Sequence, residues 1–233
     1  MPINIDLDQS LSSKMLKTYA PGVFPTGQGP NIYFNGPFCS IATAMPAYAS
    51  SSTETSLITG ATTTGFGTAP TMVNIGSQSG NATYISGTYR IPGNFLLLGT
   101  RVAWDFIGSI ANTVTPNLTV KAGLQNASTG TFTALATTGV TAMVNLAGTG
   151  VIHVKGDFMI TASASATANT IVGWIGNEYG YGTAVGNDVY GGPTSTATFD
   201  LSVDYYFDIR ATWGTNSASN TITLSYGNVW VMA

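Results

Sequence analysis

Hydrophobic residues alternate with polar or small ones along most of the chain after residue 84. From residue 101, for example, Val102, Trp104 and Phe106 are separated by Ala103 and Asp105. A period of two is typical of strands that bury one face. We therefore predict strands over residues 84–91, 101–107, 117–124, 131–135, 142–146, 151–160, 169–175, 196–201, 205–213 and 220–232.

These strands follow one another at short intervals, without a helical pattern between them. Many short strands separated by turns indicate an antiparallel sandwich. A region of about 150 residues with eight or more strands has the size of a jelly roll, in which two four-stranded sheets cover one core. We predict an all-β chain: an antiparallel jelly-roll-like sandwich over residues 84–233, preceded by an extended N-terminal arm.

Residues 1–38 follow a different pattern. Leu7, Leu11 and Met15 recur every fourth residue, which predicts a short helix over about residues 8–18. The prolines and glycines that follow prevent a continuous helix or strand, so we expect an attachment arm whose aromatic side chains lie on a partner. The predicted attachment contacts are Leu7, Leu11, Met15, Phe24, Tyr33, Phe34 and Phe38.

Residues 39–83 are rich in serine, threonine, glycine and alanine. Such a composition is typical of a flexible linker. Apolar pairs, Leu57 with Ile58 and Met72 with Val73, instead favour additional short strands. The sequence leaves both interpretations open.

The composition supports the β assignment and narrows the function. Of 233 residues, 7% are charged, too few to supply the exposed faces of long amphipathic helices. The net charge of −3 and the pI of about 4.7 argue against a nucleic-acid partner, which needs a basic surface. No apolar run approaches the ~20 residues of a membrane-spanning helix, and the first residues lack the pattern of a signal peptide. We expect no nucleic-acid and no membrane partner.

Candidate catalytic chemistry is scarce. The chain has one histidine, His153, and one cysteine, Cys39, so by itself it cannot build a His/Cys metal cluster or an internal disulfide. Within residues 151–160, His153, Lys155 and Asp157 fall on the same face of the predicted strand. We predict a solvated polar cluster there rather than a catalytic base, and we expect no enzyme activity and no cofactor.

Asp200, Asp204 and Asp208 recur every fourth residue, but the segment that holds them alternates as a strand. Asp208 and Arg210 then share one strand face, and we predict an ordinary surface pair. A pair of carboxylates for glycoside hydrolysis, or a cation site built from all three, is the lesser alternative.

Several segments resemble a small jelly-roll domain of tailed-bacteriophage virion proteins. SGTYRIPGNFLLLGTRV, residues 86–102, resembles its extended opening segment and the turn into the next strand. FDLSVDYYFDIRATWG, residues 199–214, and SASNTITL, residues 217–224, resemble its tryptophan-ended strand and its last turn. The likeness covers about residues 85–233, and it departs from the family pattern at Gly93 and in a long Gly/Tyr loop over residues 177–192.

The resemblance implies a head-fibre, capsid-decoration or tail-fibre component, which is usually trimeric and not enzymatic. We therefore expect a virion protein, made in the host cytoplasm, that forms a homotrimer and decorates or cements the capsid. Its arm would bind the major capsid protein or another virion protein. The low charge independently favours a permanent assembly.

The alternative is a tail-fibre or spike module that recognises a host surface glycan or protein. An aromatic-rich loop suits the stacking of sugar rings, whereas Gly/Tyr loops also pack at subunit contacts. The candidate recognition residues are Tyr179, Tyr181 and Tyr190.

Overall fold

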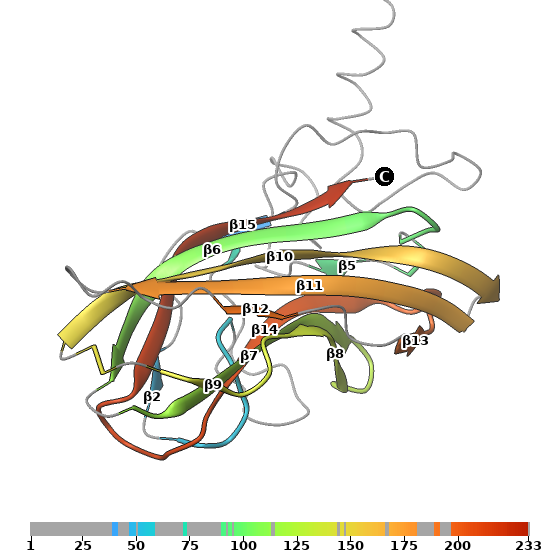
Figure 1. Cartoon of the computed structure of the whole chain (residues 1–233). Helices are drawn as coiled ribbons and strands as arrows, with labels where there is room; N and C mark the ends of the chain where they lie inside the picture. Colours follow the sequence, from blue (N-terminus) through green and yellow to red (C-terminus); the bar gives the residue numbers. More distant parts are fainter. Residues whose placement is uncertain are drawn as a thin grey trace, which may run out of the picture.

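Two antiparallel β-sheets face each other across one hydrophobic core in the computed structural model of this chain (Figure 1). The structure describes residues 39–41, 47–49, 51–58, 72–73, 90–91, 93–94, 96–112, 115–143, 145–146, 148–165, 168–180, 189–191 and 197–232. These residues form strands and turns, and no helix that could cross a membrane occurs among them. The predicted all-β antiparallel sandwich is confirmed, and the predicted arm lies outside the described residues.

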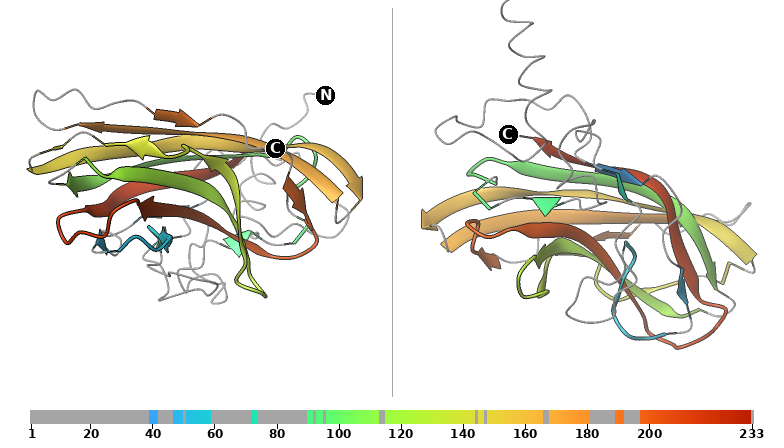
Figure 2. Two further views of the ribbon diagram at one scale, coloured as in Figure 1. Left: turned by 60° about the horizontal axis from the view of Figure 1, so that its bottom comes forward. Right: turned by 180° about the vertical axis from the view of Figure 1, so that it is seen from behind.

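The larger sheet contains the longest strands. Its members are β1 (Cys39–Ile41), β2 (Tyr48–Ala49), β4 (Met72–Val73), β6 (Arg101–Asn112), β10 (Gly148–Ser165), β11 (Ala168–Gly180), β12 (Val189–Gly191), β13 (Ala197–Phe199) and β15 (Thr221–Met232). They are ordered β12-β11-β10-β6-β15-β1-β4, with β13 paired to β11 and β2 paired to β15. Figure 2 shows the four long strands β6, β10, β11 and β15 as one broad layer.

The smaller sheet lies against one face of this layer (Figure 2). Its members are β3 (Thr55–Ser56), β5 (Arg90–Ile91), β7 (Asn117–Asn126), β8 (Phe132–Thr137), β9 (Thr141–Ala142) and β14 (Tyr205–Trp213). They are ordered β3-β14-β7-β8, with β5 paired to β14 and β9 paired to β7. The other face of the larger sheet is therefore the outer face of the sandwich.

Aromatic side chains join the two sheets in the core. Phe207 of β14 contacts both Trp104 and Phe106 of β6, with ring centroids 5.2 and 6.2 Å apart. All three rings are buried, as the alternation in both strands predicts. Gly156 of β10 leaves room for this cluster, because a Cβ atom there would lie 2.6 Å from Cζ2 of Trp104.

The strand predictions differ in their outcomes. β14 has the predicted bounds, whereas β6, β10 and β11 extend beyond theirs because their ladders continue through glycines and small polar residues. The predicted strand at 142–146 is wrong, since pairing with β7 stops at Ala142. Leu146 is nevertheless buried, and its backbone N–H donates to Oδ1 of Asn112 at 3.1 Å. A side-chain amide there replaces the partner that a ladder would have supplied.

Residues 39–83 add three strands to the larger sheet and one to the smaller sheet, beside the six and five described strands that later residues supply, so both sheets exceed the four strands expected for each. β1, β2 and β4 lie on the β15 side of the larger sheet, and β3 pairs with β14 in the smaller one. The described parts of this region thus contain four short strands, β1 to β4. The described parts therefore support the second of the two interpretations.

Candidate functional site

The residues predicted to contact a partner fall mostly outside the described part of the chain. This holds for Leu7, Leu11, Met15, Phe24, Tyr33, Phe34, Phe38 and Tyr181. The backbone of Tyr179 pairs with Ile152, and the backbone of Tyr190 pairs with Gly176. The predicted loop over residues 177–192 is thus wrong at both ends, because β11 continues to Gly180 and β12 begins at Val189. Here the ladder between β10 and β11 runs without a register shift from the pair Ile160–Ile171 to the pair Val151–Gly180.

His153 lies on the outer face of the larger sheet, between two carboxylates on neighbouring strands. Its Nε2 atom is 2.8 Å from Oδ1 of Asp105 on β6, and its Nδ1 atom is 3.3 Å from Oε2 of Glu178 on β11. Lys155 of β10 also contacts Glu178, and the hydrogen bond from this lysine is the main reason that the pKa of Glu178 is lowered. The predicted polar cluster on a partly solvated strand face is confirmed.

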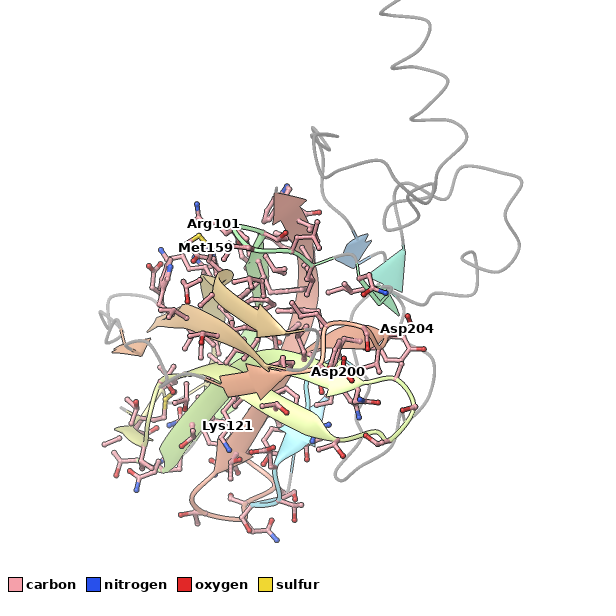
Figure 3. All side chains as sticks on the ribbon, turned by 90° about the vertical axis from the view of Figure 1, so that its right-hand side faces the viewer. Arg101, Lys121, Met159, Asp200 and Asp204 are labelled. Atoms are coloured by element: carbon pink, nitrogen blue, oxygen red, sulfur yellow. The ribbon has the colours of Figure 1, made fainter. Side chains whose placement is uncertain are left out.

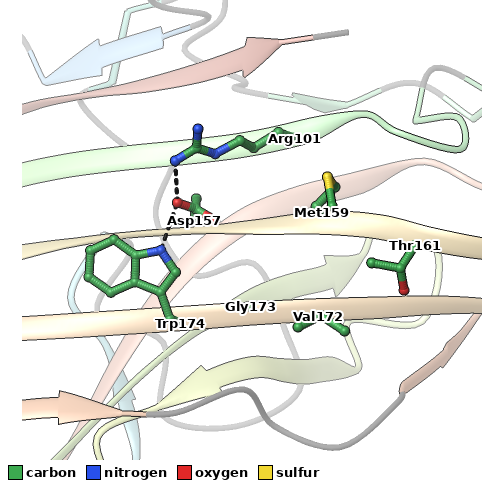
Figure 4. A pocket seen from close by; sticks show the side chains of 7 residues that line it. All are labelled: Arg101, Asp157, Met159, Thr161, Val172, Gly173 and Trp174. Atoms are coloured by element: carbon green, nitrogen blue, oxygen red, sulfur yellow. Dashed lines mark hydrogen bonds and ion pairs between the residues drawn. The ribbon is translucent and has the colours of Figure 1, made fainter.

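A second set of outer-face residues surrounds an open hollow, which we call the Trp174 hollow. Its volume is about 410 Å³, and it is lined by Arg101, Asp157, Met159, Thr161, Val172, Gly173 and Trp174 (Figure 4). These residues come from three adjacent strands: β6, β10 and β11.

Two hydrogen bonds to one carboxylate oxygen hold the polar side of the Trp174 hollow. Oδ2 of Asp157 accepts from Nη2 of Arg101 at 2.5 Å and from Nε1 of Trp174 at 2.7 Å. The Arg101 side chain is 50% exposed and that of Asp157 is 14% exposed. We call Arg101 and Asp157 the outer pair. Asp157 of this pair orients the indole ring through its hydrogen bond with Trp174.

The apolar side of the Trp174 hollow consists of Met159 and Val172, which are 41% and 38% exposed. They pair directly across β10 and β11, and Met159 also pairs with Arg101 across β10 and β6. Figure 3 shows Arg101 and Met159 together, away from Lys121, Asp200 and Asp204. The alternation in residues 151–160 predicted that Asp157 lies on this face. It did not predict Trp174 as its partner, because the sequence of one strand does not show which residues of the next strand lie opposite it.

Asp208 and Arg210 correct the prediction of a surface pair. Their side chains are 0% and 5% exposed, and Nε of Arg210 lies 2.8 Å from Oδ2 of Asp208. Ser56 of β3 donates its hydroxyl to Oδ1 of Asp208 at 2.5 Å. β3 pairs along the edge of β14, and Ser56 and Leu57 are buried beside it, so we call Asp208 and Arg210 the buried pair.

The buried pair has further neighbours of opposite charge. Nη1 of Arg210 lies 3.8 Å from Oε1 of Glu54, and Lys121 of β7 contacts the same glutamate. The guanidinium also stacks 4.4 Å above the ring of Phe132. Desolvation outweighs the attraction of Arg210 and raises the pKa of Asp208 to about 6. This cluster holds β3 on the smaller sheet.

The three aspartates of the 200–208 series do not converge. Oδ1 of Asp200 accepts from the backbone N–H of Ser202 at 2.9 Å, and Oδ1 of Asp204 accepts from the backbone N–H of Gly93 at 2.6 Å. Asp208 belongs to the buried pair. Among the described residues, no group of three His, Cys, Asp or Glu side chains could hold a metal ion. Each carboxylate of the series therefore has a separate local contact.

The chain is thus a two-layer antiparallel β-sandwich. The outer face of its larger sheet presents polar side chains and the indole of Trp174. No protein-family model and no curated protein matches the chain in sequence.

Proposed function

We propose that the chain is a non-enzymatic structural protein of a tailed-bacteriophage virion, which decorates or cements the capsid through residues 1–38. The resemblance of residues 86–102, 199–214 and 217–224 to virion jelly rolls motivates the proposal. The antiparallel sandwich is compatible with it. A fold alone does not define a function, and the charge distribution of the surface therefore supports the proposal more strongly than the sandwich does.

The observation that carries the proposal is the low uncompensated charge of the sandwich. Every basic side chain that the structure describes contacts a carboxylate: Arg101 with Asp157, Lys121 with Glu54, Lys155 with Glu178, and Arg210 with Asp208. Large apolar side chains are also exposed, among them Leu98 at 62% and Val140 at 75%. A surface of this kind gives a free monomer little electrostatic protection against association, whereas a subunit in a permanent assembly does not need it.

A homotrimer bound to the major capsid protein or to another virion protein is the assembly that we propose. The test is a reconstruction by cryo-electron microscopy of the particle whose genome encodes the chain. We expect density for the sandwich on the capsid lattice, in groups of three copies. Density at the tail tip alone would contradict capsid decoration and favour receptor binding.

Receptor binding is the second candidate function, and the Trp174 hollow favours it. An open depression with an aromatic side chain and a hydrogen-bonded ion pair is a geometry suited to a small polar ligand. On the proposed alternative, the module recognises a host surface glycan or protein. The two candidates differ in where the protein lies on the particle.

A further inference from the structure

We propose that the Trp174 hollow is a binding site for a neutral saccharide of one or two sugar rings. Nothing in the capsid-decoration proposal requires such a site. The inference rests on the geometry of the hollow, so it can be tested on the isolated protein whether or not the chain is a virion component.

The apolar side of the hollow suits the C–H face of a pyranose ring. The indole of Trp174, the thioether of Met159 and the methyl groups of Val172 lie along two adjacent strands (Figure 4). Aromatic rings are large and rigid, so stacking on them costs little conformational entropy. The bond from Nε1 of Trp174 to Asp157 restrains the ring before any ligand arrives.

The polar side suits sugar hydroxyl groups. A carboxylate accepts hydrogen bonds and a guanidinium donates them, and the outer pair places both at one edge of the hollow. Asp157 is held by two donors and Arg101 is held by Asp157, so both groups are oriented in the free protein. Oriented partners of this kind distinguish hydroxyl arrangements, which a purely apolar groove does not.

The charge of the face favours a neutral ligand over an anionic one. Arg101 is compensated by Asp157 and Lys155 by Glu178, while Asp105 adds a further carboxylate beside His153. This additional carboxylate would repel phosphate, acidic sugars and nucleic acid, and both cations are already paired. The volume of about 410 Å³ lies in the range of small-molecule sites.

The test is a titration of the ¹⁵N-labelled full chain, followed through the tryptophan indole N–H resonances. The probes are the methyl glycosides of glucose, galactose, mannose, rhamnose and N-acetylglucosamine, with maltose and cellobiose. We expect at least one probe to shift the Trp174 resonance, assigned by its loss in Trp174→Phe. The Trp104 and Trp213 resonances are internal controls that should stay in place, because both side chains are buried in the core.

Variants separate the proposed contacts from general effects on the fold. Trp174→Ala and Asp157→Asn should each weaken the affinity for the binding probe by about tenfold or more. The matched control is Tyr226→Ala, which removes an aromatic side chain that is 58% exposed in β15 and does not line the hollow. This variant should bind as the wild type does, and melting curves of all variants show whether they are folded.

Three results would overturn the proposal. The first is that no neutral probe shifts the Trp174 resonance at millimolar concentration. The second is equal affinity of the wild type and of folded Trp174→Ala and Asp157→Asn variants. The third is preferential binding of glucuronate, N-acetylneuraminate or an apolar peptide, any of which would assign the hollow to a different ligand class. None of these results bears on capsid attachment.

Discussion

The part of the chain that the structure describes contains two arginine–aspartate pairs, one on each sheet, and they differ mainly in how deeply they are buried. The outer pair, Arg101 and Asp157, crosses two strands of the larger sheet and borders an open hollow. The buried pair, Asp208 and Arg210, lies on one strand of the smaller sheet, beside a paired segment that is far away in sequence. The same chemical groups are therefore accessible to a ligand in one place and structural in the other.

Burial changes both the contribution of such a pair to the free energy of unfolding and its accessibility to a ligand. Exposed ion pairs contribute little to stability because water screens their attraction and solvates each partner separately. A buried pair carries a large desolvation cost, and removing one partner leaves the other without compensation. The outer pair can therefore be altered at little cost to the fold, whereas the buried pair cannot. Three predictions test this difference.

The largest effect is expected from Arg210→Met. This variant removes the cation from beside a carboxylate that is 0% exposed, and it should lower the free energy of unfolding at pH 7 by roughly 3–5 kcal/mol. The measurement is urea unfolding. The matched control, Arg101→Met, removes the cation of the outer pair and should cost below about 1 kcal/mol. Similar losses in the two variants would contradict the comparison.

The second effect is a pH dependence of the free energy of unfolding, which arises from Asp208 of the buried pair. The pKa of Asp208 is about 6 in the folded chain, against 3.8 for an aspartate in an unfolded chain. Since the folded state binds the proton more tightly, Asp208 contributes stability below pH 3.8, and this contribution is lost as the pH rises through about 6. Its full size is about 3 kcal/mol.

The comparison of wild type with Asp208→Asn isolates this contribution, because the amide does not titrate. Urea unfolding at several pH values should show the wild type losing stability relative to Asp208→Asn between pH 4 and pH 7. A constant difference between wild type and Asp208→Asn would mean that Asp208 titrates normally.

The smallest effect is expected within the outer pair itself. A double-mutant cycle of Arg101→Met and Asp157→Asn should give a coupling energy below about 1 kcal/mol, and added salt should reduce it further. The measurement is urea unfolding at low and high ionic strength. A coupling of several kcal/mol that salt does not change would place the outer pair in the same class as the buried one.

Sequence patterns predicted the strands well where both faces of a strand differ in polarity. The alternation in β14 gave its bounds, and that in β6 gave the buried positions of Trp104 and Phe106. The outer-face position of His153 followed in the same way. In each case the relevant information is local, because side chains of neighbouring residues point to opposite faces.

The remaining features depend on contacts between distant segments. Alternation places Asp208 and Arg210 on one face of β14, but it does not indicate that β3, about 150 residues earlier, pairs with β14 and brings Ser56 to Asp208. Trp174 meets Asp157 through a register between two strands, and Glu178 meets His153 through the same register. Glycines such as Gly108 occupy buried positions and conceal the length of β6, which continues to Asn112 beyond its predicted end at residue 107. For these reasons the sequence predicted the class of fold but not the hollow.

The central functional claim, attachment to a capsid through residues 1–38, is tested most directly by deleting these residues and measuring incorporation into particles. We predict that the shortened chain keeps its cooperative unfolding transition, since strands of both sheets lie in residues 39–232. It should then be absent from purified particles, whereas a Val140→Thr control, altered on the exposed surface of the sandwich, should be present in normal amounts. Incorporation of the folded, shortened chain at normal occupancy would contradict the proposed attachment.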